Sequence, residues 1–189
     1  MIQSKADLIE YMKMDRYALG KTRKHPLPIG DEIWRFEIYL RKHEYYLNTK
    51  KSKLLLYYYT IRHHLLGIRL GFSVPCNVFG GGLRINHHGY LVVNGKAKIG
   101  NFCDIHQGVN IGESTDSLAP HMGDDVWIGP GAKIFGGITL GSDLMIGANA
   151  VVNKSFYENG ITLAGVPAKK ISQKGNYHKR CQRYNEMSK

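Results

Sequence analysis

A six-residue repeat fills much of the second half of the chain and constrains its fold more than any other feature. From Met122 the residues divide into hexads that read MGDDVW, IGPGAK, IFGGIT, LGSDLM, IGANAV and VNKSFY. The first and fifth positions of every hexad are apolar, and glycine follows the first residue in four of the six. The same frame runs backward to Gly81. A period of six fits neither an α-helix nor a hairpin sheet.

The repeat predicts a triangular coil in which each hexad supplies one short strand and one tight turn. Two apolar positions per hexad point into the prism, while glycine, asparagine or aspartate relieves strain at the corners. Three hexads make one coil, so about four coils stack between Gly81 and Tyr157. We therefore predict a mainly β protein, a left-handed parallel β-helix preceded by an α-helical region. The expected divisions are an α-helical region (1–72), a β-helix (73–171) and a basic, partly disordered tail (172–189).

The repeat loses its phase once, between Ile111 and Met122, which lie 11 residues apart where 12 would keep the frame. Residues 113–121 are therefore expected to leave the prism as a loop, and loops on solenoids often build binding surfaces. Four histidines fall within 35 residues near this break: His87, His88, His106 and His121. His87 holds a leading hexad position, which should carry an apolar side chain. It is the first candidate for a functional residue.

The N-terminal third reads as helices. Ser4 and Asp7 resemble a capping box, and Asp31 is expected to cap a second helix. A third helix is expected from Lys53 to Leu70. This last stretch is apolar and aromatic, but it contains two arginines and two histidines, which a membrane-spanning helix would hardly tolerate. We expect it to pack on its own protein or on a partner subunit.

The net charge of +11 is concentrated at the two ends of the chain. Residues 1–70 carry +7, residues 71–171 are neutral and residues 172–189 carry +4. No interleaved aromatic and basic motif accompanies this charge, so nucleic-acid binding is not expected. The three cysteines are widely spaced, which favours reduced thiols over disulfides or a cysteine zinc site. The N-terminus lacks the apolar core of a signal peptide, so a cytoplasmic location is expected.

The segment from about Asn77 to Ile171 resembles the hexapeptide-repeat acyltransferases, most closely the serine acetyltransferase group. The stretches that carry the resemblance are INHHGYLVV (85–93), IGPGAKI (128–134), IGANAVV (146–152) and GVPA (165–168). The resemblance covers about half of the chain. It implies transfer of an acetyl group from acetyl-CoA to a hydroxyl in a ternary complex, with no covalent intermediate and no metal. It also implies a homotrimer with its sites between subunits.

When the family's catalytic position is transferred to this sequence, the resemblance implies that His87 is the general base, which takes the proton of the acceptor hydroxyl. Asn86 and His106 are then expected to bind the acceptor, and His121 is the second candidate for the base or a further acceptor contact. The expected coenzyme A contacts are Gly112, Pro130, Ala148, Ala168 and Lys169, with Lys154 and Lys170 as additional phosphate partners.

Three departures from the family pattern bear on the acceptor. Asn86 stands where the family has an aspartate before the base, no acid occupies the region of Phe72 where the family has an orienting aspartate, and His25-Pro26 replaces an Asp-Pro pair. An ammonium group prefers a carboxylate partner, so we predict a sugar hydroxyl as acceptor, on a surface polysaccharide or its precursor. L-serine, feeding cysteine synthesis, is the alternative.

Two functions outside the acetyltransferase class are also considered. A zinc lyase of the γ-carbonic-anhydrase type uses the same β-helix with three histidines around a metal, and His87, His106 and His121 are the candidates for it. A non-enzymatic scaffold is the other. Failure to bind coenzyme A would favour the scaffold, and bound zinc would favour the lyase.

Overall fold

The apolar hexad positions form the core of a parallel β-helix, as the repeat predicted. The computed structural model describes residues 1–115 and 117–187. Leading residues such as Ile105, Ile128 and Ile146 are fully buried, and so are fifth-position residues such as Val109 and Leu144. The prediction that His87 holds a leading position was wrong, because Ile85 is the residue that pairs with the leading Ile105. The turn from Ile85 to Val93 is two residues longer than the equivalent turn from Ile105 to Ile111, so His87 lies exposed in it. The solenoid has about five turns and begins earlier than Gly81, with a strand at Phe72–Ser73.

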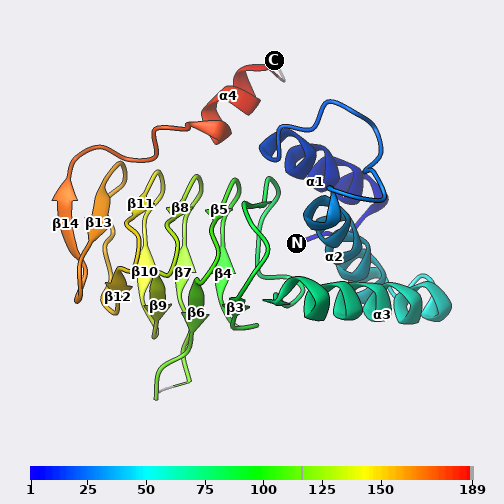
Figure 1. Ribbon diagram of the computed structural model, residues 1–189, viewed down its shortest axis with the longest axis horizontal. Coiled ribbons are helices and arrows are strands. Elements are labelled where there is room, and N and C mark those ends of the chain that lie inside the picture. The colour runs from blue at the N-terminus through cyan, green and yellow to red at the C-terminus, as the bar shows by residue number, and fades with distance from the viewer. Residues whose placement is uncertain (116, 188–189) are drawn as a thin grey trace.

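Three parallel sheets make the sides of the prism (Figure 1). Sheet I contains β1 (Phe72–Ser73), β3 (Leu91–Val93), β6 (Asn110–Gly112), β9 (Lys133–Phe135) and β12 (Val151–Val152). Sheet II contains β4 (Lys98–Ile99), β7 (His121–Met122) and β10 (Thr139–Leu140). Sheet III contains β2 (Arg84–Ile85), β5 (Asp104–Ile105), β8 (Trp127–Ile128), β11 (Met145–Ile146), β13 (Thr162–Ala164) and β14 (Lys169–Ser172), the last of which pairs antiparallel with β13.

The helices are α1 (Lys5–Ala18), α2 (Glu32–Thr49), α3 (Lys53–Leu70) and α4 (Arg180–Met187). Helices α1 to α3 stand at the N-terminal end of the solenoid (Figure 1). The capping box of Ser4 and Asp7 is confirmed, and α3 spans the predicted residues. Asp31 occupies the N-cap position of α2, but its side chain makes no cap bond. It accepts hydrogen bonds from the Lys21 Nζ and the Leu27 backbone N–H instead.

Carboxylates of α1 and α2 cap the open edge of the first coil. An edge strand presents unpaired N–H groups, which need partners when they are buried. Asp15, Glu37 and Glu44 are buried and supply these partners. Asp15 accepts from Gly82 and Leu83, Glu37 from Ile85, and Glu44 from Asn77, over 2.7 to 3.1 Å. The helical region is therefore hydrogen-bonded to the coil that carries His87.

Arg41 completes this cap and is fully buried. Its guanidinium donates to both oxygens of Asp15, at 2.7 and 3.1 Å, and to Glu44 at 3.0 Å. It also donates to the carbonyls of Phe79 and Gly80 at 2.9 and 2.5 Å. One arginine thus satisfies free carbonyls of the first coil and the carboxylates beside them.

The C-terminal tail is ordered within the described residues, contrary to our expectation from its polar sequence. After β14 the chain returns along the solenoid and brings α4 beside α1 (Figure 1). Asn176 is buried and donates to Asp125, and Tyr184 packs against Tyr17 and Phe102. This aromatic contact covers a corner where Phe102 has a φ of 57°, a conformation that a bulky residue adopts only when its surroundings hold it.

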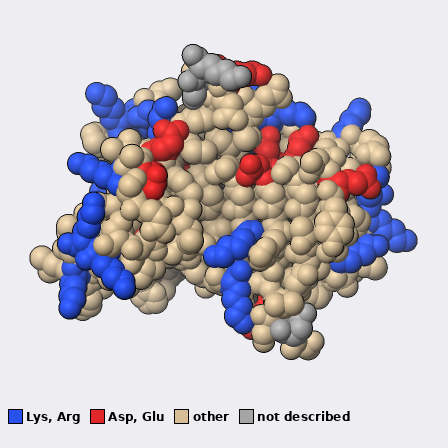
Figure 2. All heavy atoms as spheres, turned by 180° about the vertical axis from the view of Figure 1, so that it is seen from behind, with Lys and Arg blue, Asp and Glu red and all other residues tan. Residues whose placement is uncertain are grey.

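The basic side chains gather toward the two ends of the molecule, as Figure 2 shows for one face. The helical region, which forms one of these ends, carries a surplus of +7. Across the described residues, none of the helices combines the length and hydropathy needed to cross a bilayer. The α3 helix exposes apolar side chains, including Leu54, Tyr57, Leu65 and Ile68.

Candidate acetyl-transfer site

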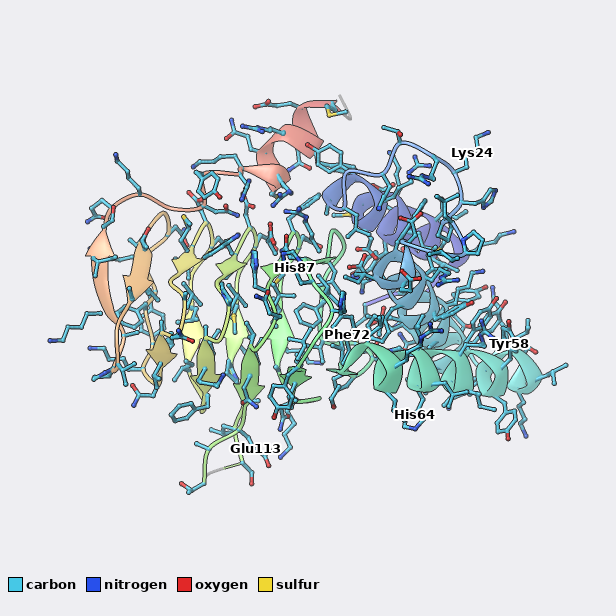
Figure 3. The ribbon with its side chains drawn as sticks, viewed as in Figure 1. Lys24, Tyr58, His64, Phe72, His87 and Glu113 are labelled. Atoms are coloured by element: carbon cyan, nitrogen blue, oxygen red, sulfur yellow. The ribbon has the colours of Figure 1, made fainter. Side chains whose placement is uncertain are left out.

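His87 lies in the turn that joins β2 of sheet III to β3 of sheet I, on the coil nearest the helices (Figure 3). Its side chain is exposed in the single chain. The ring of His106, one coil further on, lies 6.1 Å from the His87 ring, centroid to centroid. Asn86 and His106 hold equivalent positions, each directly after a strand of sheet III. The structure thus brings together the three predicted residues His87, Asn86 and His106.

Asp104 is the polar centre of this cluster, and the sequence had not singled it out. Its side chain is 1% exposed. The Asp104 carboxylate accepts hydrogen bonds from the Asn86 amide, from Arg84 at 3.1 Å and from Arg180 of the returning tail. Nε2 of His106 lies 3.8 Å from it. One buried carboxylate therefore orients side chains from two coils and from the tail.

His106 also packs on Trp127, with ring centroids 4.9 Å apart. Burial lowers the pKa of His106, and the Asp104 carboxylate opposes that shift. A lowered pKa keeps the imidazole neutral near physiological pH, when it can both donate and accept a hydrogen bond. His106 is therefore suited to contact a neutral hydroxyl group.

A cavity of about 550 Å³ opens between this turn and the helical region. Asn86 and His88 line it on the solenoid side, together with Arg84. Glu32 and Arg69 line it from the ends of α2 and α3. Backbone N–H groups, above all that of Glu32 itself and that of Gly30, lower the pKa of the Glu32 carboxyl, so it is ionised near neutral pH. The cavity therefore presents both a carboxylate and guanidinium groups to a ligand beside the candidate base.

Pro130 and Ala148, two of the predicted coenzyme A contacts, lie in the turns after β8 and β11. These turns stack on the same corner as the His87 turn, as the bonds from Gly131 N–H to Gln107 O and from Asn149 N–H to Pro130 O show. Gly112 is the last residue of β6, the middle strand of sheet I. Their contact with coenzyme A stays a prediction.

The remaining predicted contacts lie at the far end of the solenoid. Ala168 is 1% exposed, and its N–H donates to the Val151 carbonyl, while Lys169 is exposed at the start of β14. Lys170 pairs with Glu158 at 2.5 Å, and the Lys154 ammonium lies over the Phe156 ring. Both lysines therefore have protein partners in the structure described.

His121 lies apart from this cluster. We expected it to close the loop, but it is the first residue of β7, paired with Lys98 and Thr139 in sheet II. It lines a separate cavity of about 330 Å³ that includes Tyr11 and Lys98. Within the described parts of the chain, His87, His106 and His121 do not form a group with metal-ligand geometry. This arrangement gives no support to the three-histidine zinc site.

No acid replaces the family's orienting aspartate at Phe72. The Phe72 ring is buried, and it packs on the Phe36 ring with centroids 5.1 Å apart (Figure 3). Asp104 reaches the cluster from the next coil and contacts Asn86, the neighbour of His87. Since these partners are 18 or more residues apart in the sequence, only the stacking of the coils brings them together.

Three comparisons with known proteins agree with this geometry. Residues 119–154 match the family model described as "Bacterial transferase hexapeptide (six repeats)". The serine acetyltransferase of Mycobacterium tuberculosis is 38% identical over 102 residues, which are 52% of this chain and 44% of that protein. That of Staphylococcus xylosus is 32% identical over 140 residues, which are 72% of this chain and 62% of that protein. The chain spans about half the length of the curated relatives it matches.

Solved structures give the same result for the fold. The crystal structure of the serine acetyltransferase of Brucella abortus superimposes with a TM-score of 0.71 at 26% identity, covering 90% of this chain and 71% of that one. That of Neisseria gonorrhoeae gives 0.68 at 27% identity, covering 89% and 68%. The superposition includes the helical region, because it reaches well beyond the repeats.

Proposed function

Because the chain is a serine acetyltransferase-like protein of the hexapeptide-repeat class, we propose that it transfers an acetyl group from acetyl-CoA to a hydroxyl acceptor. The observation that carries the proposal is the position of His87, exposed on the corner turn beside a charged cavity. The relatives share the repeat and the helical region, and each of those named above is a serine acetyltransferase.

In the proposed reaction the His87 imidazole takes the proton of the acceptor hydroxyl as its oxygen attacks the thioester carbonyl. A free alcohol attacks a thioester poorly near neutral pH, so this proton transfer is the part of the reaction that needs a base. The tetrahedral intermediate then expels the coenzyme A thiolate. A hydrogen-bond donor to the oxyanion of this intermediate would lower the barrier further.

The cysteines support direct transfer without an acetyl-enzyme. Burial raises the pKa of the Cys103 thiol well above its usual range and that of Cys76 to about 12. Burial also raises the pKa of Cys181. A nucleophilic cysteine needs a lowered pKa, so none of these thiols is activated.

For the acceptor, the relatives support L-serine better than the sugar that the missing acids led us to favour. The structure weakens the objection to serine, because Glu32 supplies a carboxylate in the cavity beside Asn86. Arg84 and Arg69 line the same cavity and suit the carboxylate of an amino acid. We therefore propose L-serine as the acceptor. The sugar hydroxyl is the second candidate, which the neutral amide of Asn86 favours.

We further propose a homotrimer that binds coenzyme A between its subunits. The corner turns with Pro130 and Ala148 stack between the His87 turn and the turn that precedes Ala168 and Lys169. The exposed apolar face of α3 is available for a subunit contact as well. A soluble cytoplasmic enzyme is the setting that fits these proposals.

The test is a steady-state assay of thiol release from acetyl-CoA, with L-serine and a panel of sugars as acceptors. We expect turnover with L-serine and little with sugars. His87→Ala should lower kcat by about 10²–10⁴-fold, the usual contribution of a general base. The matched control is His64→Ala, an exposed histidine on α3, which should leave kcat unchanged. Turnover with sugars alone would overturn the serine assignment.

His121→Ala decides between the two candidate bases. It should leave kcat within about twofold of the wild type, because His121 lies on sheet II and away from His87. If His121→Ala abolishes turnover and His87→Ala does not, the general base is His121. If coenzyme A does not bind in calorimetry, the protein is a scaffold and not an enzyme.

A further inference from the structure

A group of two histidines and one cysteine lies where the helices meet the first coil. His43 is on α2, His63 is on α3, and Cys76 follows β1. The ligand atoms of the three side chains all lie within 4.8 Å of one another. The two Nδ1 atoms are 3.1 Å apart. None of the three residues lines the cavity beside His87, and the proposed reaction has no use for them.

We propose that His43, His63 and Cys76 form a binding site for a zinc ion. A tetrahedral zinc ion has Zn–N distances of about 2.0 Å and Zn–S distances of about 2.3 Å, so its ligand atoms are roughly 3.3 to 3.6 Å apart. The two nitrogens are already close to that spacing, and the Cys76 sulfur lies within 4.8 Å of both. Imidazole and thiolate together suit zinc better than calcium or magnesium, which take oxygen ligands.

Hydrogen bonds around His43 fix the tautomer that a metal ligand needs. The Thr60 hydroxyl donates its one proton to the Leu56 carbonyl at 2.8 Å. Its oxygen therefore accepts from Nε2–H of His43, at 3.0 Å. Nδ1 of the neutral ring then carries a lone pair that is directed at His63. Ligating histidines commonly donate their other N–H group to such a partner, which orients the ring.

Zinc would replace the proton that the two rings share. Their Nδ1 atoms are 3.1 Å apart, which is a hydrogen-bond distance, so one of the two nitrogens carries a proton. Because Nδ1 of His43 carries the lone pair, this proton is on Nδ1 of His63. When zinc binds, the thiol releases its proton to solvent, and the His63 proton moves from Nδ1 to Nε2.

The site is open to solvent and leaves room for a fourth ligand. A cavity of about 390 Å³ is lined by His43, His63 and Thr60, and it extends along Val74 and Pro75, next to Cys76. An ion can enter through it and keep a water molecule as its fourth ligand. Because the three ligands come from α2, α3 and the first coil, the ion would link the helical region to the solenoid.

Titration of chelator-treated protein with Co²⁺, followed by displacement with Zn²⁺, tests the proposal. We expect one equivalent of Co²⁺ to bind, with a thiolate-to-cobalt charge-transfer absorption that one equivalent of Zn²⁺ abolishes. Cys76→Ser should remove this absorption and weaken binding at least about tenfold. Cys181→Ser is the matched control, on α4 and away from this cavity, and it should retain both.

A second variant guards against a folding defect. His43→Gln changes a half-buried ligand, so circular dichroism should remain that of the wild type while Co²⁺ binding falls at least about tenfold. Zinc should also raise the Tm of the wild type, but not of this variant. No charge-transfer absorption in the wild type, or its persistence in Cys76→Ser, would overturn the assignment. Acetyl transfer does not enter these measurements, so the site is tested independently of the proposed function.

Discussion

Replacing Arg41 by methionine should destabilise the protein strongly, because it removes the one cation between two buried carboxylates. The side chains of Asp15 and Glu44 are 3% and 2% exposed. Removing one partner of a buried ion pair typically costs about 3–5 kcal/mol, since it leaves an uncompensated buried charge. The carbonyls of Phe79 and Gly80 lose a donor at the same time. We therefore expect the free energy of unfolding to fall by at least about 3–5 kcal/mol.

The same buried charges predict how the loss of stability in Arg41→Met depends on pH. Burial and the Asp15 carboxylate hold the pKa of Glu37 well above its usual range, and Arg41 opposes that shift, so Arg41→Met raises this pKa further above the unfolded value. The folded variant then binds more protons than the unfolded chain, so the variant gains stability as pH falls. The deficit relative to the wild type should shrink between pH 8 and pH 5.

Urea denaturation followed by circular dichroism at pH 8 and pH 5 measures both quantities. Arg35→Met is the control on the same helix. Arg35 is partly exposed and pairs with Glu32 at 3.4 Å, so its loss should cost less than about 1 kcal/mol. If Arg41→Met costs no more than the control, or if its deficit is the same at both pH values, the cap does not depend on the buried charges in this way.

Two further substitutions test the corner and the tail. Burial, reinforced by Asp143, raises the pKa of Asp125 to about 6 from 3.8, so its contribution to stability falls as pH rises from about 4 to 6. Asparagine tolerates the local φ of 58°, so Asp125→Asn should raise the unfolding free energy at pH 8 by about 1 kcal/mol. The stability of this variant should also depend less on pH between about pH 4 and pH 6, as measured by thermal melts. A steeper pH dependence would contradict this. Asp104→Asn removes the charge that faces Arg180, so trypsin should cleave the tail after Lys174 or Lys179 several-fold faster. Glu158→Gln, which faces Lys170 at the surface of β14, should have a smaller effect. Equal cleavage rates would show that Asp104 does not hold the tail.

The prism was predictable because its signal is repeated many times. Each hexad places apolar side chains at the same two positions, and their burial at Ile128, Ile134 and Leu144 follows directly. The third helix was predicted to the residue, because Ser52 precedes it and Gly71 ends it in a left-handed conformation. Local signals of this kind do not depend on distant partners.

The polar contacts were not predictable in the same way. Asp104 lies between two buried hexad positions and looks like one more outward residue in the sequence. Its partner Arg180 is 76 residues away, in a segment whose composition suggested disorder. The buried carboxylates of α2 look like solvent-facing charges, because a helical pattern cannot show that an open sheet edge lies against that face. The spacing of Glu37, Arg41 and Glu44, which share one side of the helix, was the available signal.

The caps at the two ends of the solenoid also determine how large the particle can become. A parallel β-helix with bare ends offers unpaired backbone groups to another solenoid, and such edges lead to end-to-end polymers. Here Asp15, Glu37 and Glu44 already accept from four N–H groups of the first coil, and the antiparallel strand β14 covers the edge of sheet III at the other end. Chains of this protein are thereby prevented from stacking into filaments along the solenoid axis.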